Sequence, residues 1–138
     1  MDASRSKTHV FQILYLNEQN NSMDTNQYQS FAKEYLGGEF ANLELLITAF
    51  THRSYLNEHK KSASEHNERL EFLGDAVLEL VVTEYLFTNH GEPEGILTNW
   101  RSSLVRTESI GAAAARLGVE PLLRLSRGEK RGTERARA

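Results

Sequence analysis

The sequence has no cysteine, only two prolines and no long hydrophobic run. Without cysteine, a disulfide framework and a thiolate metal site are both excluded. The only compact apolar run near the start, residues 10–16, is too short to span a membrane. Arg5 and Lys7 precede it as in a signal peptide, but no small-residue cleavage site follows. We therefore expect a cytoplasmic protein that has no membrane partner.

The net charge of −3 conceals an asymmetry along the 138 residues. Residues 124–138 hold six basic and two acidic residues, a balance of +4, and the remaining ten basic and seventeen acidic residues give −7. An acidic body with a basic end could bind metal in one place and phosphate in another. A solvated basic tail explains the same pattern equally well.

Apolar residues recur at helical spacing from residue 28 onward, and no alternation of period two persists. Helices are predicted over residues 28–36, 43–50, 68–88, 96–106 and 110–117, with a short helix or a packed extended segment near residues 122–125. Asn42 and Asn67 can cap helices, and Gly37-Gly38 and Gly118 can end them. The predicted fold class is all-α, with five or six helices in a bundle-like array.

Residues 67–75 are the most informative stretch. Glu68, Glu71 and Asp75 follow helical spacings of i, i+3 and i+7, so one helix face carries three carboxylates. Like charges at this spacing repel by roughly 0.2–0.5 kcal/mol per pair. Mg²⁺ would remove that repulsion, although a solvated acidic face is the commoner explanation. Gly74 costs the helix about 1 kcal/mol relative to alanine, which favours close approach by a backbone of this chain or of a second subunit.

Residues 67–75 resemble the signature motif of the ribonuclease III family, which cleaves double-stranded RNA. Residues 45–55, which end in Thr-His-Arg-Ser-Tyr, are similar to the segment before that motif. Residues 97–118 and 128–130 resemble the segments that follow it. The resemblance covers residues 28–138.

The resemblance implies a homodimeric, all-helical catalytic domain that hydrolyses phosphodiesters with Mg²⁺, or with Mn²⁺ as an alternative ion. It implies ribosomal and messenger RNA precursors as substrates. Glu71 matches a metal ligand, and Asp75 matches the catalytic carboxylate that also organises the metal. Glu68 matches an additional acid that lines the cleft. Phe72 matches the aromatic side chain that enters a pocket of the partner subunit, with an ordinary core position as the alternative.

The match departs from the family pattern at its end. The family's next helix carries a second Asp and Glu that complete the metal site, and neither that helix nor a double-stranded-RNA-binding domain precedes Ala138. We therefore expect residues 1–24 to be a disordered polar segment and residues 25–138 to be a partial catalytic domain with uncovered apolar surface. We expect this domain to be inactive alone. The alternative is a non-catalytic protein that dimerises or binds RNA.

Other polar and aromatic residues favour structural interpretations. We expect His52 to be a capping or buried histidine next to a paired Arg53, rather than a catalytic group. His59 and His66 lie in a polar loop and are expected to be solvated. Trp100 is expected in the core, rather than as a platform for RNA bases.

Overall fold

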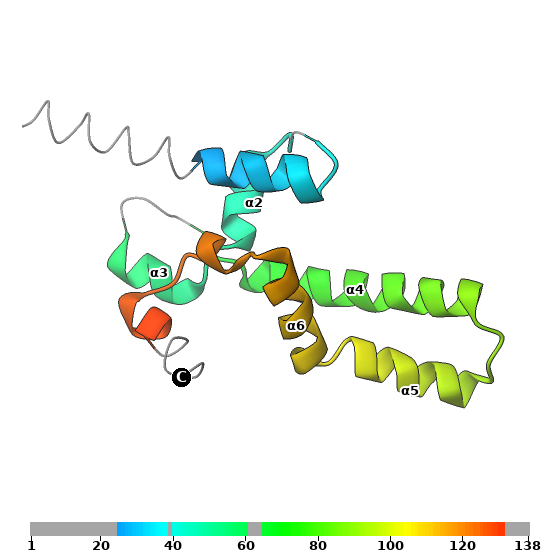
Figure 1. Ribbon diagram of the computed structural model, residues 1–138. Helices are drawn as coiled ribbons and strands as arrows, with labels where there is room; N and C mark the ends of the chain where they lie inside the picture. The colour runs from blue at the N-terminus through cyan, green and yellow to red at the C-terminus, as the bar shows by residue number, and fades with distance from the viewer. Residues whose placement is uncertain (1–24, 39, 61–64, 132–138) are drawn as a thin grey trace, which may run out of the picture. The chain divides into compact units, whose positions relative to one another are not determined.

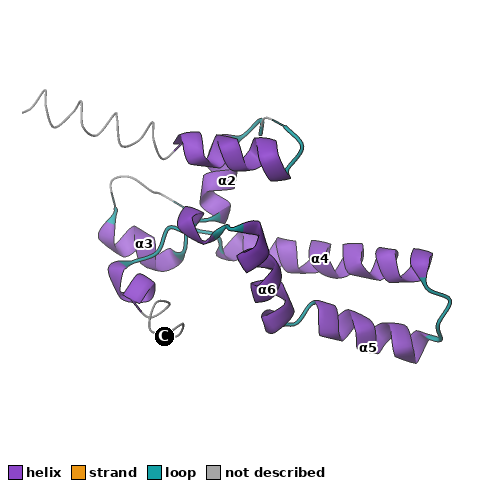
Figure 2. Cartoon of the chain, in the orientation of Figure 1, coloured by secondary structure: helices purple, strands orange, loops and turns teal. Residues whose placement is uncertain are grey.

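The structure is a computed structural model that describes residues 25–38, 40–60 and 65–131 (Figure 1). Its regular elements are helices, as Figure 2 shows, and one isolated bridge joins Thr51 and Arg124. The all-α prediction is therefore confirmed. The chain divides into two compact units, residues 1–47 and 48–138. The predicted N-terminal segment, residues 1–24, lies outside the described residues.

The first unit contains a helix over residues 25–35. Tyr28 and Ala32, one turn apart, are buried. The helix is followed by Gly37 and Gly38, whose φ angles of 81° and 152° lie where glycine is favoured. The Gly38 amide donates to the Ala32 carbonyl at 3.4 Å. The predicted glycine stop is confirmed.

Helix α2 (Leu43–Ala49) begins in the first unit and ends in the second. Its predicted cap is present, because Oδ1 of Asn42 accepts a hydrogen bond from the Leu45 amide at 3.2 Å. Leu46 and Ile47, two of the predicted apolar positions, are buried. Sequence pattern and structure therefore agree for this helix.

The second unit holds the remaining elements. They are α3 (Arg53–Glu58), α4 (Glu68–Asn89), α5 (Glu94–Leu104), α6 (Thr107–Leu117), the 3₁₀ turn η1 (Glu120–Leu122) and a helical stretch at residues 127–131. Helices α4 and α5 lie side by side and run in opposite directions, and α5 also contacts α6 (Figure 1).

Helix α5 begins and ends two residues earlier than predicted. The prediction began at Ile96, the first apolar residue of the pattern. Pro93 instead takes the N-cap position with an extended backbone, φ −58° and ψ 151°. Glu94 then occupies the first turn, where the helix dipole stabilises a carboxylate. Charge at the helix start, rather than apolar spacing, sets this boundary.

Helices α4 and α5 are held together by one buried side chain and by the polar contacts of one arginine, which we call the polar clamp. Leu86 of α4 is 4% exposed. Nε of Arg101, on α5, lies 3.6 Å from Oε1 of Glu79, and its Nη1 donates to Oγ1 of Thr83 at 3.2 Å. These contacts hold α5 along the second half of α4.

The aromatic residue of α5 lies at the margin of this packing. Trp100 is 39% exposed, and its ring meets the edge of His90 at a centroid distance of 5.1 Å. The prediction that Trp100 belongs to the core was wrong, because its neighbour is a histidine in the turn after α4.

A large apolar surface of α4 is exposed. It consists of Phe72, Leu73, Val77, Leu80 and Val81, each between 51% and 84% exposed, and we call it the apolar surface of α4. Such a patch normally marks an interface. Among the described helices, none is both long enough and apolar enough to cross a membrane.

Candidate functional site

The start of α4 is tied to the segment before α3. The Asn67 amide donates to the Thr51 carbonyl at 2.9 Å, and its side-chain Nδ2 donates to the Ala49 carbonyl at 3.3 Å. Asn67 occupies the predicted N-cap position, but its side chain does not cap the helix. The capping prediction was wrong, because the side-chain amide donates across the chain instead.

A distant segment closes the same junction. The His52 amide donates to the Arg124 carbonyl at 3.0 Å, and the Arg124 amide donates to the Phe50 carbonyl at 2.8 Å. The Arg124 guanidinium lies over the Tyr55 ring at 4.5 Å, within the range of a cation–π contact. We call residues 49–55, 66–68 and 122–127 the junction.

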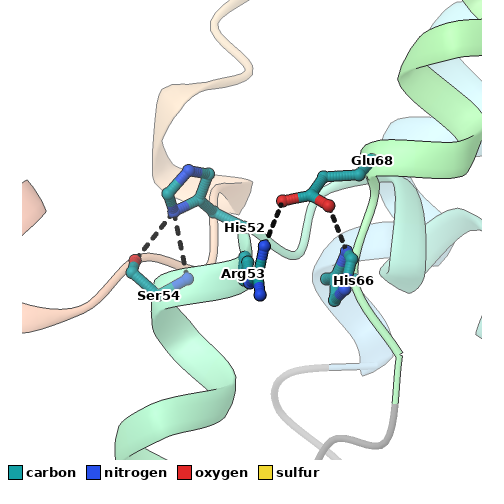
Figure 3. Close-up of polar contacts among 5 residues, drawn as sticks. All are labelled: His52, Arg53, Ser54, His66 and Glu68. Carbon is teal, nitrogen blue, oxygen red and sulfur yellow. Dashed lines mark hydrogen bonds and ion pairs between the residues drawn. The ribbon is translucent and has the colours of Figure 1, made fainter.

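His52 and Ser54 act inside this junction. Nδ1 of His52 accepts a hydrogen bond from the Ser54 amide at 3.2 Å and so caps α3 (Figure 3). The Ser54 hydroxyl accepts one from the Ser126 amide at 3.0 Å. The capping interpretation of His52 is confirmed, and Ser54 links α3 to the chain that follows η1.

Glu68 points from the first turn of α4 toward an arginine and a histidine side chain. Oε1 lies 3.5 Å from Nη1 of Arg53, and Oε2 lies 3.8 Å from Nδ1 of His66 (Figure 3). The His66 Nδ1 atom is enclosed and has no hydrogen-bond partner. The expectation that His66 is solvated was therefore wrong for this atom.

Glu71 and Asp75, the predicted metal residues, follow on the same helix. Both are exposed, and within the described part of the chain neither side chain makes a hydrogen bond or an ion pair. At a spacing of i and i+4 they project from one face of α4. The structure thus places an unpaired carboxylate pair where the motif predicted one.

The acidic row extends one residue further than the sequence motif. Glu79 lies four positions after Asp75 and pairs with Arg101 at 3.6 Å. The i+4 repeat could have revealed it, but the motif ends earlier. The two outer acids, Glu68 and Glu79, are therefore paired with arginines, whereas the inner two are not.

The unpaired carboxylates suit one kind of cation. In the described residues, no group of three or more histidine, aspartate or glutamate side chains is arranged to hold a metal ion. Mg²⁺ nevertheless commonly takes only one or two carboxylates and completes its six ligands with water and substrate phosphate. Glu71 and Asp75 fit that donor set.

Phe72 and Gly74 lie among these acids and contact little of the described chain. Phe72 is 84% exposed, so the alternative of a core position is excluded within this chain. A Cβ atom built on Gly74 would meet nothing within 4 Å. No close backbone neighbour from the described residues explains this glycine.

An all-helical domain with an exposed carboxylate pair on its long helix is consistent with the class of helical nuclease domains. Sequence comparison makes the assignment specific, since a family model described as Ribonuclease-III-like matches residues 42–138. That match covers more than half of the chain. The chain belongs to the ribonuclease-III-like family.

Individual relatives agree with this assignment. Ribonuclease 3 of Streptococcus thermophilus is 44% identical over 114 residues, which cover 82% of this chain and 50% of that protein. Ribonuclease 3 of Streptococcus agalactiae is 49% identical over 106 residues, covering 76% and 46%. The chain spans about half the length of these curated relatives.

A solved structure matches the fold as well. It is the nuclease domain of ribonuclease III from Campylobacter jejuni, with a TM-score of 0.64 and 41% identity, covering 75% of this chain and 69% of that one. That structure is described as showing flexibility in a region involved in dimer formation.

Proposed function

We propose that this chain provides the carboxylate helix of an endoribonuclease that hydrolyses double-stranded RNA with Mg²⁺, or with Mn²⁺ in its place. The observation that carries the proposal is the row on α4, in which Glu71 and Asp75 are exposed and unpaired between two arginine-paired acids. Family membership supplies the reaction class, and the row supplies the residues.

A bound Mg²⁺ would neutralise the charge that develops on the phosphate and would lower the pKa of a bound water. The chain's own contribution is to hold the two carboxylates in a fixed register on one helix. In this proposal Glu71 would serve as a metal ligand, and Asp75 would be the catalytic carboxylate that also helps to hold the metal. The junction fixes the first turn of α4, so Glu71 starts from a defined position.

The substrate follows from the same family. Double-stranded RNA is recognised mainly through its shape, its phosphates and its 2′-hydroxyl groups. We therefore propose RNA processing, including ribosomal and messenger precursors, with little sequence selectivity. A cytoplasmic location remains a prediction of the sequence.

A homodimer belongs to the proposal too. The apolar surface of α4 is exposed, with Phe72 at its start, and the space beside Gly74 is open. A second copy that packs on this surface would cover Phe72 and give Gly74 its close neighbour. The dimer-forming nuclease domain of the Campylobacter structure supports this arrangement.

The decisive experiment measures cleavage in a protein of full family length. Residues 42–138, the matched segment, replace the corresponding part of the Streptococcus agalactiae relative. Asp75→Asn or Glu71→Gln should lower Mg²⁺-dependent cleavage about a thousandfold, because metal stabilisation of the transition state is worth several kcal/mol. Circular dichroism should show unchanged helix content.

Glu84→Gln is the matched control, since Glu84 is another exposed acid of α4 and its side chain makes no hydrogen bond or ion pair with the residues that the structure describes. It should cleave at the rate of the unsubstituted chimera. Equal cleavage by the Asp75→Asn protein would refute the residue assignment. A chimera that binds double-stranded RNA without cleaving it would favour the non-catalytic alternative.

A further inference from the structure

The acidic row of α4 consists of Glu68, Glu71, Asp75 and Glu79. It differs from an ordinary acidic helix face because its two outer carboxylates are ion-paired, whereas its two inner ones are not. Glu68 pairs with Arg53 and His66 at the start, and Glu79 pairs with Arg101 four positions after Asp75. Glu71 and Asp75 make no such contact within the described residues. Arg53 lies on α3 and Arg101 on α5, so the two arginine pairs are tertiary contacts, whereas His66 is only two residues before Glu68.

We infer that Arg53 and Arg101 are positioning residues that bracket the cation site. Each holds one outer acid of the row away from a bound ion, so that Glu71 and Asp75 are the carboxylates of α4 that bind the cation. This inference rests on the proposed function and deepens it, because it assigns Glu68 a role that the sequence left unsettled.

The geometry of the contact between Arg53 and Glu68, at the start of the row, supports this role for Glu68. One of its oxygens is directed at Arg53 and the other at His66, so each oxygen has a basic side chain beside it (Figure 3). His66 and Asn67 precede it directly, and Asn67 is hydrogen-bonded to Thr51 and Ala49. The segment that fixes the helix start therefore also supplies His66, and Arg53 of α3 supplies the other contact to Glu68.

The contact between Arg101 and Glu79, at the other end of the row, is built differently but also engages the outer acid. Arg101 is only 33% exposed, and its guanidinium contacts both the Glu79 carboxylate and the Thr83 hydroxyl. Thr83 in turn donates to the Glu79 carbonyl at 2.7 Å. Arg101 is held in place by α4 itself, and its charge offsets that of Glu79.

These pairs act through orientation rather than strength. Pairs exposed to solvent shift an equilibrium by about fivefold at most. They cannot exclude a cation outright, but they decide which carboxylates are unpaired when it arrives. The consequence can be tested, because removal of an arginine should enlarge the cation site toward the acid that it held.

The test records amide signals of the ¹⁵N-labelled 138-residue chain while Mn²⁺ alone is added, since Mn²⁺ broadens signals near its binding site. In the unsubstituted protein, broadening should centre on the turn between Glu71 and Asp75. Arg53→Gln should extend it toward Glu68, and Arg101→Gln should extend it toward Glu79. Arg69→Gln, at a neighbouring exposed arginine that pairs with no acid among the described residues, should leave the map unchanged.

Reciprocal variants complete the test. Glu68→Gln and Glu79→Gln should leave the Mn²⁺ dissociation constant within about twofold, whereas Asp75→Asn should raise it about tenfold, the change expected when one good ligand contact is lost. An increase as large in Glu68→Gln as in Asp75→Asn would make Glu68 a ligand and overturn the inference. So would an Arg53→Gln map that matches the unsubstituted one, or the absence of broadening near Glu71.

Charge exchange provides a second measurement that does not depend on metal. Arg53→Glu and Glu68→Arg should each destabilise the chain in urea, and the double variant should recover about twofold to fivefold in the unfolding equilibrium constant. The control exchange joins Glu68→Arg with Arg69→Glu, because adjacent helix residues do not face each other. Equal recovery in both exchanges would show that Arg53 and Glu68 are not coupled.

The failures of the two proposals are distinguishable. Suppose that Asp75→Asn abolishes cleavage by the chimera and that Glu68→Gln abolishes Mn²⁺ binding. The nuclease assignment then stands, but the positioning role of the arginines is refuted, because Glu68 is itself a ligand. Suppose instead that cleavage persists in Asp75→Asn while the Mn²⁺ broadening changes as expected in the arginine variants. Glu71 and Asp75 then bind the cation, but the nuclease assignment is wrong.

Discussion

The junction and the apolar surface of α4 lie one helical turn apart and are stabilised in opposite ways. The junction is a polar network in which segments about seventy residues apart exchange backbone hydrogen bonds, and Thr51 at its centre is 1% exposed. The apolar surface begins at Phe72, which is 84% exposed. Hydrogen bonds thus determine where α4 starts, while its apolar side chains remain available to a partner.

Leu86, in the last turn of α4, belongs to neither region, and this contrast gives the largest expected effect. Leu86 is 4% exposed and its neighbour Phe87 is 80% exposed. Leu86→Ala should lower the free energy of unfolding by about 2–3 kcal/mol, the lower part of the usual range for a buried leucine, because the surrounding groove is open and can relax. Urea unfolding followed by circular dichroism measures the change.

Phe87→Ala is the matched control for Leu86→Ala. It removes a larger side chain from the next position of the same helix and should cost about 0.5 kcal/mol or less, as surface substitutions usually do. If both variants lose the same stability, then burial of Leu86 does not distinguish this side chain from the exposed apolar side chains of α4.

How much of this comparison was predictable from the sequence depends on the residue. Periodicity predicted α2 and its Asn42 cap, and it predicted the glycine stops at Gly37 and Gly118, because these are local properties of the chain. It could not predict which apolar positions of α4 would be covered. Val77 and Leu86 look equivalent in the pattern, yet only Leu86 is buried.

The candidate site shows the same division. The sequence located Glu71 and Asp75, because residue type and spacing are visible in one helix. It missed the arginine pairing of Glu68 and Glu79, since Arg53 and Arg101 approach from other elements. Asn67 was misjudged for the same reason, because a local rule predicted a cap where tertiary partners use the side chain.

A second effect, expected to be of similar or smaller size, concerns association rather than folding. If a second copy covers the apolar surface of α4, Phe72→Ala should weaken self-association by about 2 kcal/mol, roughly thirtyfold, as expected for an aromatic anchor. Stability of the monomer should not change, because the side chain is already exposed. Sedimentation equilibrium measures the first quantity and urea unfolding the second.

Phe87→Ala serves again as the control, since Phe87 is equally exposed but lies outside the surface that begins at Phe72. It should leave self-association unchanged. A chain that sediments as a monomer at every concentration would contradict the homodimer proposal, and an equal loss in both variants would mean that the interface extends over the α4–α5 groove.

The smallest effect concerns the polar clamp that joins α5 to α4. Arg101→Met keeps most of the side-chain length but removes the ion pair with Glu79 and the hydrogen bond to Thr83, so the unfolding free energy should fall by about 1 kcal/mol. Arg106→Met is the control, because its contact with Glu108 is longer, at 3.9 Å, and more exposed. A loss confined to Arg101→Met, and reduced in high salt, would show that partly buried polar contacts hold α5 on α4 alongside Leu86. Equal losses would mean that the Arg101 contacts add nothing to the burial of Leu86 in holding the two helices together.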